Sequence, residues 1–204
     1  MPSRKPMGVE PRRVVLASGS PRRRAFLEDL GLTFEVRAAD IDETPFPVED
    51  PVVYVERLAR AKALAARRLR SDEVVIAADT TVVLDGEIIG KPTDDADAAT
   101  ILRRLSGRAH LVLSGVAVVV ANSDPHSIVV PTTVTFANLS DNDIAWYIGT
   151  GEPHGKAGAY AIQGRGAALV RSVEGSVTNI VGLPLVELAE LLTKAGAPIG
   201  ALRG

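Results

Sequence analysis

The chain has 204 residues, enough for one substantial domain or two small lobes but too few for a multidomain assembly. Hydrophobic residues make up 46% and aromatic residues only 4%, a bias that favours sheets covered by helices. The formal net charge is −2, so the chain lacks the basic field that stable nucleic-acid binding requires. The absence of cysteine excludes disulfides, thiolate metal sites and cysteine nucleophiles.

No apolar run reaches membrane-spanning length, and none near the N-terminus resembles a signal peptide. We therefore expect a cytoplasmic protein without membrane association. Residues 1–12 combine Pro, Gly and charge without periodicity, which predicts a loose leader. The remaining residues, 13–204, are expected to form a single two-lobed domain.

The first third of the chain predicts alternating strands and helices. We expect strands at 14–17 and 33–38, a helix at 22–30 that ends at Gly31, an acidic loop at 40–50, and a long helix from Asp50-Pro51 to about Leu69.

The rest of the chain adds hairpins to this alternation. Asp85-Gly86 is the strongest hairpin signal in the sequence. Strands are expected at 74–78, which runs into Asp79, and at 80–84, 87–89, 110–121, 127–136 and 167–173. Helices are expected at 94–105 and 140–147 and from Pro184, with a glycine-rich segment at 149–166. This order predicts an α/β fold with a mixed sheet.

The loop at residues 18–23 is a candidate anion site. Its small residues precede a helix, and backbone N–H groups at a helix start attract an anion. Arginines in a first helical turn are unfavourable because their charge has the same sign as that end of the helix dipole. A bound phosphate would compensate the charges of Arg22 and Arg23. Arg23 also lies on the apolar stripe and should point inward. Ser18 belongs to the same loop. The alternative is an ordinary loop with surface arginines.

Lys62 is a candidate because it lies on the buried stripe of the long helix. That stripe is predicted to contain Val55, Leu58, position 62, Ala65 and Leu69, while Arg57, Arg60, Arg67 and Arg68 face away. A buried ammonium needs a partner or a ligand. The alternative is a lysine that reaches past its small neighbours to water.

Asp79 follows a buried strand, the position where open α/β sheets place ligands. It could hold a divalent metal or activate a water, and otherwise it caps a turn. Glu43, in the acidic loop, could complete a site of oxygen ligands, or it is simply solvated. Ser114-Gly115, inside an apolar strand, suggests a bulge or a close backbone approach.

Three further residues lie in predicted loops. Lys91 follows the hairpin and could reach a phosphate, although a lone loop lysine is usually solvated. Lys156 and Gln163 lie in a flexible glycine-rich loop, and the Gln163 amide could read the edge of a base. Several basic groups, two carboxylates and no nucleophile–His pair favour metal-assisted hydrolysis of a phosphate ester or anhydride.

Together these motifs resemble the Maf family of nucleoside triphosphate pyrophosphatases, in order, from about residue 13 to residue 195. The matching segments are ASGSPRR at 17–23, ADT at 78–80, GKP at 90–92, GKAGAYAIQG at 155–164, GS at 175–176 and NIVGLP at 179–184. The segment Gly-Glu-Pro-His at 151–154 departs from the family, which often has an aromatic residue after the Gly-Glu pair.

The resemblance implies a two-lobed α/β fold on a long mixed sheet, similar to inosine triphosphate pyrophosphatases, and a homodimer. Residues 79–80 and 161–164 resemble the branch that acts on dTTP and UTP, and CTP or modified pyrimidine nucleotides are further candidate substrates. The implied cofactor is Mg²⁺ or Mn²⁺. The implied roles are a proton acceptor (Asp79), base selection (Arg22, Thr80, Gln163), and a phosphate and metal site (Ser18, Arg23, Glu43, Lys62, Lys91).

By this reading Asp79 activates a water that attacks the α-phosphorus and releases pyrophosphate. Two alternatives remain open at this point. One is a pyrophosphatase that clears non-standard purine triphosphates. The other is a regulator of cell division or septum formation that acts by binding partners.

Overall fold

The computed structural model describes residues 12–68 and 70–203. The expected leader lies outside this range except for Arg12, whose Nη1 donates to the Gly196 carbonyl at 2.8 Å. Within the described residues no helix has the length and apolar character needed to cross a bilayer.

The described strands form one mixed sheet. They are β1 (Arg13–Leu16), β2 (Phe34–Val36), β3 (Glu73–Leu84), β4 (Glu87–Ile89), β5 (Ala109–Val120), β6 (His126–Phe136) and β7 (Val170–Glu174). Their order is β2-β1-β3-β5-β6-β7, and β4 pairs with β3. Strand β1 is parallel to β2 and β3, whereas all the other pairs are antiparallel. The expected α/β fold with a mixed sheet is confirmed.

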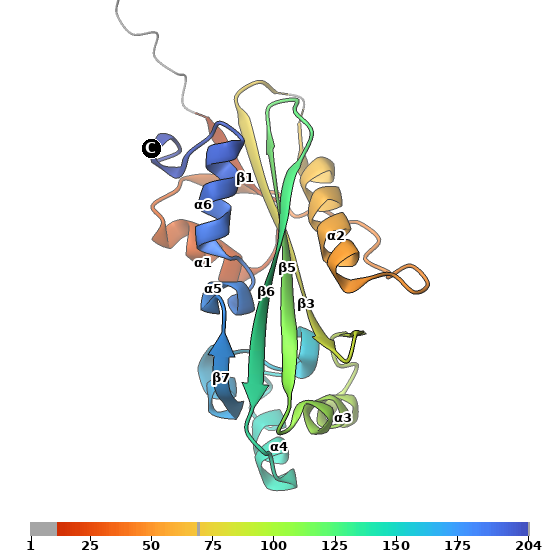
Figure 1. The fold of residues 1–204 in the computed structure, drawn as a ribbon. Helices are drawn as coiled ribbons and strands as arrows, with labels where there is room; N and C mark the ends of the chain where they lie inside the picture. The colour runs from red at the N-terminus through yellow and green to blue at the C-terminus, as the bar shows by residue number, and fades with distance from the viewer. Residues whose placement is uncertain (1–11, 69, 204) are drawn as a thin grey trace, which may run out of the picture.

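Helices cover the long strands at both ends (Figure 1). The α-helices are α1 (Pro21–Asp29), α2 (Pro51–Ala66), α3 (Asp95–Leu105), α4 (Asp141–Ile148), α5 (Val177–Val181) and α6 (Leu185–Lys194). Short 3₁₀ turns are η1 (Ala157–Ala159), η2 (Gly164–Leu169) and η3 (Ile199–Ala201). Helices α1 and α6 pack on one face of the upper sheet, and α2 packs on the other.

Separate apolar cores give the molecule its two lobes. In the upper lobe, side chains that alternate along β3 enter two cores: Val74 and Ile76 face α6, and Val75 and Ala77 face α2. In the lower lobe, α3, α4 and the turns after them enclose a third core around Phe136. Strands β3, β5 and β6 run through both lobes (Figure 1) and join them.

Three expectations about these elements were wrong. The segments 74–78 and 80–84 form one continuous strand, because β5 pairs with β3 from Val74 to Val83 without a break. Residues 167–169 belong to η2 rather than to the start of the expected strand at 167–173, and α5 was not expected. Helix α2 ends at Ala66, and Ala65 is exposed, so the buried stripe runs through Ala63 and Ala66. Leu69, the last expected member of the stripe, lies outside the described residues.

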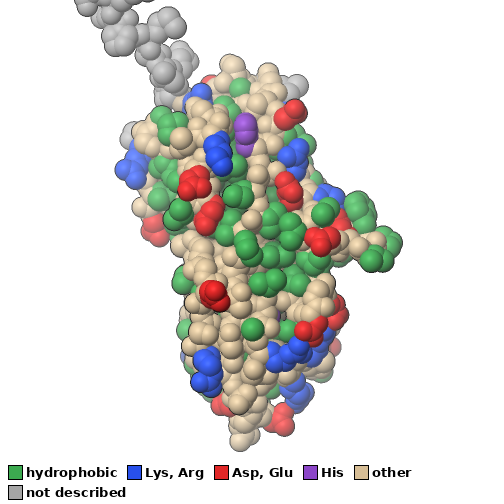
Figure 2. All heavy atoms as spheres, in the orientation of Figure 1, with side chains coloured by type: hydrophobic (Ala, Val, Ile, Leu, Met, Phe, Trp, Pro, Cys, Tyr) green, Lys and Arg blue, Asp and Glu red, His purple; other side chains and the backbone are tan. Residues whose placement is uncertain are grey.

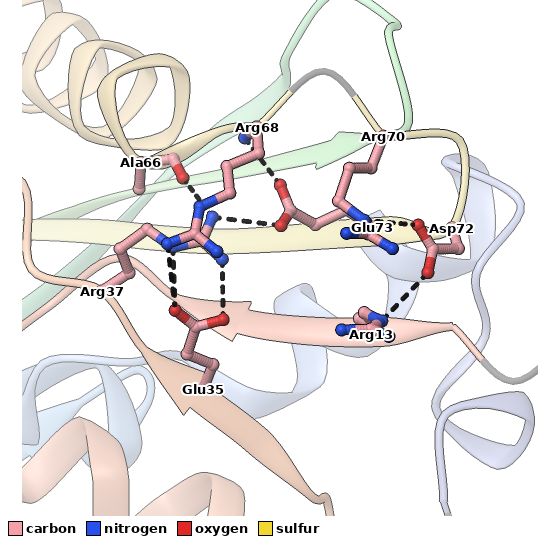
Figure 3. Close-up of polar contacts among 8 residues, drawn as sticks. All are labelled: Arg13, Glu35, Arg37, Ala66, Arg68, Arg70, Asp72 and Glu73. Carbon is pink, nitrogen blue, oxygen red and sulfur yellow. Dashed lines mark hydrogen bonds and ion pairs between the residues drawn. The ribbon is translucent and has the colours of Figure 1, made fainter.

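An ion-pair network closes the end of the sheet beyond α2 (Figure 3). The guanidinium of Arg37 donates to the Ala66 carbonyl at 2.6 Å, to Glu73 at 3.0 Å and to Glu35 at 2.8 Å. Glu73 is 2% exposed, and it also accepts a hydrogen bond from the Arg68 backbone N–H. The Arg37 charge compensates this buried carboxylate and ties α2 to the sheet.

Candidate active site

The candidate site is a cleft at an interrupted edge of β3. Strand β1 pairs with β3 as far as Ile76, and β4 pairs with it from Val82. Between these points no other described strand pairs with this edge, and Asp79 lies in this interval and lines the cleft. The cleft there is lined by every residue that the sequence singled out as a site residue: Ser18, Arg22, Arg23, Glu43, Lys62, Asp79, Thr80, Lys91, Lys156 and Gln163.

A buried lysine holds two carboxylates at the centre of the cleft. Lys62 Nζ lies 2.6 Å from Asp79 Oδ1 and 2.6 Å from Glu43 Oε1. The side chains of Lys62 and Asp79 are 10% and 11% exposed, so their ion pair is shielded from water. The expectation that Lys62 is buried and paired is therefore confirmed. This group of one ammonium and two carboxylates has a net charge of −1. Lys62 contacts the Oδ1 atom of Asp79, so Oδ2 has no hydrogen bond to the lysine.

Gly115 allows α2 to bring Lys62 onto Asp79. It pairs with Asp79 across β3 and β5. A Cβ at position 115 would lie 2.2 Å from the Val55 carbonyl oxygen, so any larger residue would push α2 away from the sheet. The close backbone approach suggested by Ser114-Gly115 is thus confirmed, and it is an approach of the helix.

The acidic loop that carries Glu43 is clamped to α2. The Arg57 guanidinium donates to both oxygens of Glu49 at 2.7 Å and to the Thr44 carbonyl at 3.2 Å, and it stacks 4.1 Å from the centre of the Phe46 ring. Burial, with the charges of Asp79 and Glu43, raises the pKa of Tyr54 to about 12, and its hydroxyl donates to the Glu43 carbonyl at 3.0 Å.

Electrostatics keep Glu43 ionised. Burial raises the pKa of its carboxyl group, but the hydrogen bond and charge of Lys62 and the charges of Lys91 and Arg23 outweigh this effect and leave that pKa below its ordinary value. Glu43 is therefore a carboxylate at neutral pH and can bind a cation.

The start of α1 forms the opposite wall. Arg23 donates through Nε to the Gly182 carbonyl at 2.8 Å, through Nη1 to Ser18 Oγ at 3.1 Å and through Nη2 to Thr80 Oγ1 at 3.1 Å. Arg22 donates to the Val181 carbonyl at 3.1 Å. Desolvation lowers the pKa of both guanidinium groups, and for Arg23 the charge of Asp79 opposes this shift. Arg23 does point inward, as expected.

The glycine-rich segment forms the third wall. Gly158 donates its N–H to the Gly90 carbonyl at 3.0 Å, which places this segment beside Lys91. Lys156 is half-buried. Desolvation, and to a smaller extent the charge of Arg22, lowers the pKa of its ammonium group. Gln163 is exposed at the mouth of the cleft. Basic groups therefore reach the cleft from three separate parts of the chain.

This set of motifs matches a known protein family, described as Maf-like protein, over residues 13–195. The chain belongs to the Maf-like family. Two relatives of this Maf-like protein carry the name dTTP/UTP pyrophosphatase. One, from Anaeromyxobacter dehalogenans (strain 2CP-C), is 56% identical over 92% of this chain and 96% of its own length. The other, from Myxococcus xanthus (strain DK1622), is 51% identical over 95% and 97%.

The HAM1 protein from Coxiella burnetii shares the fold of this Maf-like protein. The two structures superpose with a TM-score of 0.50 over 90% of this chain and 100% of that one, at 18% sequence identity. The likeness bears on the fold alone.

One expectation about the site of this Maf-like protein was wrong: Asp79 lies in the middle of β3, and the strand that ends at the cleft is β1. Arg57 and Arg60 do lie off the buried stripe of α2, as expected. Both nevertheless make contacts that were not expected, since Arg57 clamps the acidic loop and Arg60 donates to the Pro125 carbonyl and to Ser127 Oγ at 3.0 Å. Both arginines find partners that are distant in the sequence, so helical periodicity alone could not place them.

Sequence reasoning also missed a carboxylate that shapes the glycine-rich wall. Glu152 accepts hydrogen bonds from the backbone N–H groups of Arg165 at 3.0 Å and Gly166 at 3.1 Å. The buried Tyr147 hydroxyl accepts from the Ala161 N–H at 3.1 Å. These contacts bracket Gln163 on both sides. The Gly-Glu pair at 151–152 was the available signal, because a carboxylate beside glycine-rich backbone commonly binds N–H groups.

Proposed function

We propose that this protein hydrolyses dTTP and UTP to the nucleoside monophosphate and pyrophosphate. The observation that carries the proposal is the buried Lys62–Asp79 pair with Glu43 beside it, in a cleft lined by basic side chains. Hydrolysis of a phosphate anhydride needs a carboxylate that activates water and, next to it, cationic groups that bind the phosphates. The names of the relatives from Anaeromyxobacter and Myxococcus support the choice of pyrimidine substrate.

In this proposal the phosphate chain lies between the start of α1 and the glycine-rich segment. Arg23 has guanidinium N–H groups beyond those bound to Ser18, Thr80 and Gly182, and these can contact phosphate oxygens. Lys91 and Lys156 approach from the opposite wall. The base then extends toward the mouth of the cleft, where the Gln163 amide can pair with the edge of the base.

The chemical step is an in-line attack of water on the α-phosphorus. Asp79 Oδ2 accepts a proton from the water as the new P–O bond forms, while the bond from the α-phosphorus to the oxygen bridging to the β-phosphorus breaks. Lys62 binds Oδ1 and so keeps Oδ2 directed into the cleft. Lys91 and Arg23 stabilise the charge that develops on the departing pyrophosphate.

Glu43 and Asp79 are the residues that would hold a divalent cation. Among the described residues no group of three or more His, Cys, Asp or Glu side chains gathers to form a closed cage. Two carboxylates still fit Mg²⁺ or Mn²⁺, because such ions commonly take one or two carboxylates together with substrate phosphates and water. When bound, the cation would neutralise phosphate charge and orient the phosphate chain.

The decisive test is Asp79→Asn. This change keeps the shape of the side chain and removes its capacity to accept the proton, so the variant should fold normally and release almost no pyrophosphate from dTTP. Near-normal release would refute the assignment. Comparing dTTP, UTP, CTP, ITP and 7-methyl-GTP, with and without a chelator, distinguishes this function from the clearance of purine triphosphates.

The proposal includes a homodimer in the cytoplasm, where nucleoside triphosphates are made and used. Phe46 and Val48 are 59% and 104% exposed on the loop before α2, and Val52 and Val53 are exposed at the start of α2 itself. This loop projects from the body of the molecule (Figure 1), and hydrophobic side chains gather there and across the middle of the same face (Figure 2). A second copy of the chain would cover them. Sedimentation equilibrium should give twice the mass of the chain.

A further inference from the structure

Helix α5 presents two carbonyl oxygens to the arginines at the start of α1 (Figure 1). Arg22 Nε donates to the Val181 carbonyl at 3.1 Å, and Arg23 Nε donates to the Gly182 carbonyl at 2.8 Å. Val181 is the last residue of α5 and Gly182 follows it, so both oxygens belong to the end of the helix where carbonyls lack partners within the helix. That end is the negative pole of the helix dipole, which favours cations. The end of α5 therefore compensates two charges that are unfavourable at the start of α1.

A glycine is needed where α5 ends beside Arg23. Gly182 has a φ of 122°, a backbone conformation that residues with a side chain rarely adopt. Its N–H donates to the Thr178 carbonyl at 3.1 Å and to the Asn179 carbonyl at 2.9 Å, which closes the helix. The Gly182 carbonyl is therefore directed at Arg23 by the backbone of α5 itself, and the position of α5 determines the position of the guanidinium.

A buried asparagine fastens α5 to the sheet. Asn179 is fully buried, and its Nδ2 lies 3.1 Å from the Val112 carbonyl, 3.0 Å from the Val130 carbonyl and 2.9 Å from Thr132 Oγ1. The two carbonyls can only accept, so the nitrogen of the amide and not its oxygen must face them. Val112 belongs to β5, and the other two partners belong to β6. One side chain thus holds a helix of five residues, too short to be stable alone, against both strands.

We infer that Asn179 is a positioning residue that acts through α5 to hold Arg22 and Arg23 in place for the phosphates of the substrate. A fully buried side chain cannot touch a substrate, so its effect must reach the cleft through the carbonyls at the end of α5. Each contact uses Nε, and a guanidinium has further N–H groups on its terminal nitrogens that can bind phosphate oxygens. Arginines fixed in advance lose less conformational freedom when the phosphates bind. This inference rests on the proposed function, which places the phosphate chain beside these arginines.

The first measurement follows the two arginines by NMR in the protein without nucleotide. Their Nε–H signals, assigned by the loss of one signal each in Arg22→Lys and Arg23→Lys, should exchange slowly with water because each group is bound to a carbonyl. In Asn179→Ala both should exchange about tenfold faster. The control is Val119→Ala, which removes a buried side chain of β5 on the α2 side of the sheet and should leave both signals unchanged. Equal acceleration in the two variants would show a general loosening of the fold and overturn the inference.

The second measurement is the affinity for inorganic pyrophosphate, determined by calorimetry with Mg²⁺ present. The dissociation constant should rise about tenfold in Asn179→Ala and stay within about twofold of the wild-type value in Val119→Ala. An affinity unchanged in Asn179→Ala would overturn the inference.

A milder variant keeps the test decisive if Asn179→Ala does not fold. Thr132→Val keeps the shape of the side chain and removes one partner of Asn179, so it should change Nε–H exchange and pyrophosphate affinity in the same direction and by less. No change in either quantity would overturn the inference. Absence of pyrophosphate release from dTTP and UTP by the wild-type protein would instead refute the proposed function, and the exchange measurement, made without nucleotide, would still show whether Asn179 holds the arginines.

Discussion

Replacing Gly115 by Ala should separate Lys62 from Asp79 without touching either residue. The added Cβ would lie 2.2 Å from the Val55 oxygen and 2.6 Å from the Val55 carbonyl carbon, and real Cβ contacts essentially never fall below 3.0 Å. Helix α2 must therefore retreat by about 1 Å. Lys62 lies seven residues further along this helix and moves with it, so its 2.6 Å contact with Asp79 widens.

We expect Gly115→Ala to lower kcat about 100-fold, because a misplacement of about 1 Å in a catalytic group has effects of that size. Overpacking should also lower the free energy of unfolding by about 1–3 kcal/mol. Gly200→Ala is the matched control, since a Cβ there meets no atom within 4 Å. Pyrophosphate release and denaturant unfolding measure the two effects. If the two variants behave alike, the close approach of α2 does not position Lys62.

Three further predictions concern residues around the cleft. Arg57→Lys should loosen the loop that carries Glu43 and lower kcat about tenfold, because lysine cannot reproduce the two-pronged contact with Glu49. The melting temperature should change little, because lysine keeps the positive charge beside Glu49, and an unchanged kcat would contradict the clamp. In Glu152→Gln an NH2 group replaces one of the two carboxylate oxygens and faces a backbone N–H that it cannot accept from, so KM for dTTP should rise several-fold more than kcat falls. Steady-state kinetics with dTTP test this, and an unchanged KM would show that Gln163 needs no such support. Burial lowers the pKa of His110 to about 4 in the folded state. Between pH 6.5 and pH 4 the unfolded state therefore binds a proton at His110 and the folded state does not. The free energy of unfolding consequently decreases as the pH falls through this range. The loss should reach about 2 kcal/mol at pH 5 and be absent in His110→Phe, as measured by denaturant unfolding at pH 7.5 and pH 5; parallel pH profiles would contradict it.

Local signals were sufficient for most elements of the fold. Asp50-Pro51 does begin a helix, with the Asp50 carboxylate accepting from the Val52 and Val53 N–H groups. Asp85-Gly86 does form the hairpin turn between β3 and β4. Such signals act within a few residues, so a single sequence contains them completely. The unbroken course of β3 through Asp79 could not be predicted in this way, because it depends on pairing with β5, about 35 residues away.

The site was predictable in its members but not in its connections. Helical periodicity placed Lys62 on a buried face, and a buried ammonium requires a partner. Periodicity could not say that Asp79 and Glu43 would both be that partner, because they come from a strand and a loop that meet α2 only in the folded chain.

The amino-acid sequence by itself determined the family, the order of helices and strands, and which charged side chains enter the cleft, since these follow from short motifs and local patterns. Tertiary structure decided the position of α2, which depends on the missing side chain at Gly115, and the contact of Lys62 with both Asp79 and Glu43. Both are contacts between segments far apart in the chain. Their energies depend on atomic distances that no local pattern specifies.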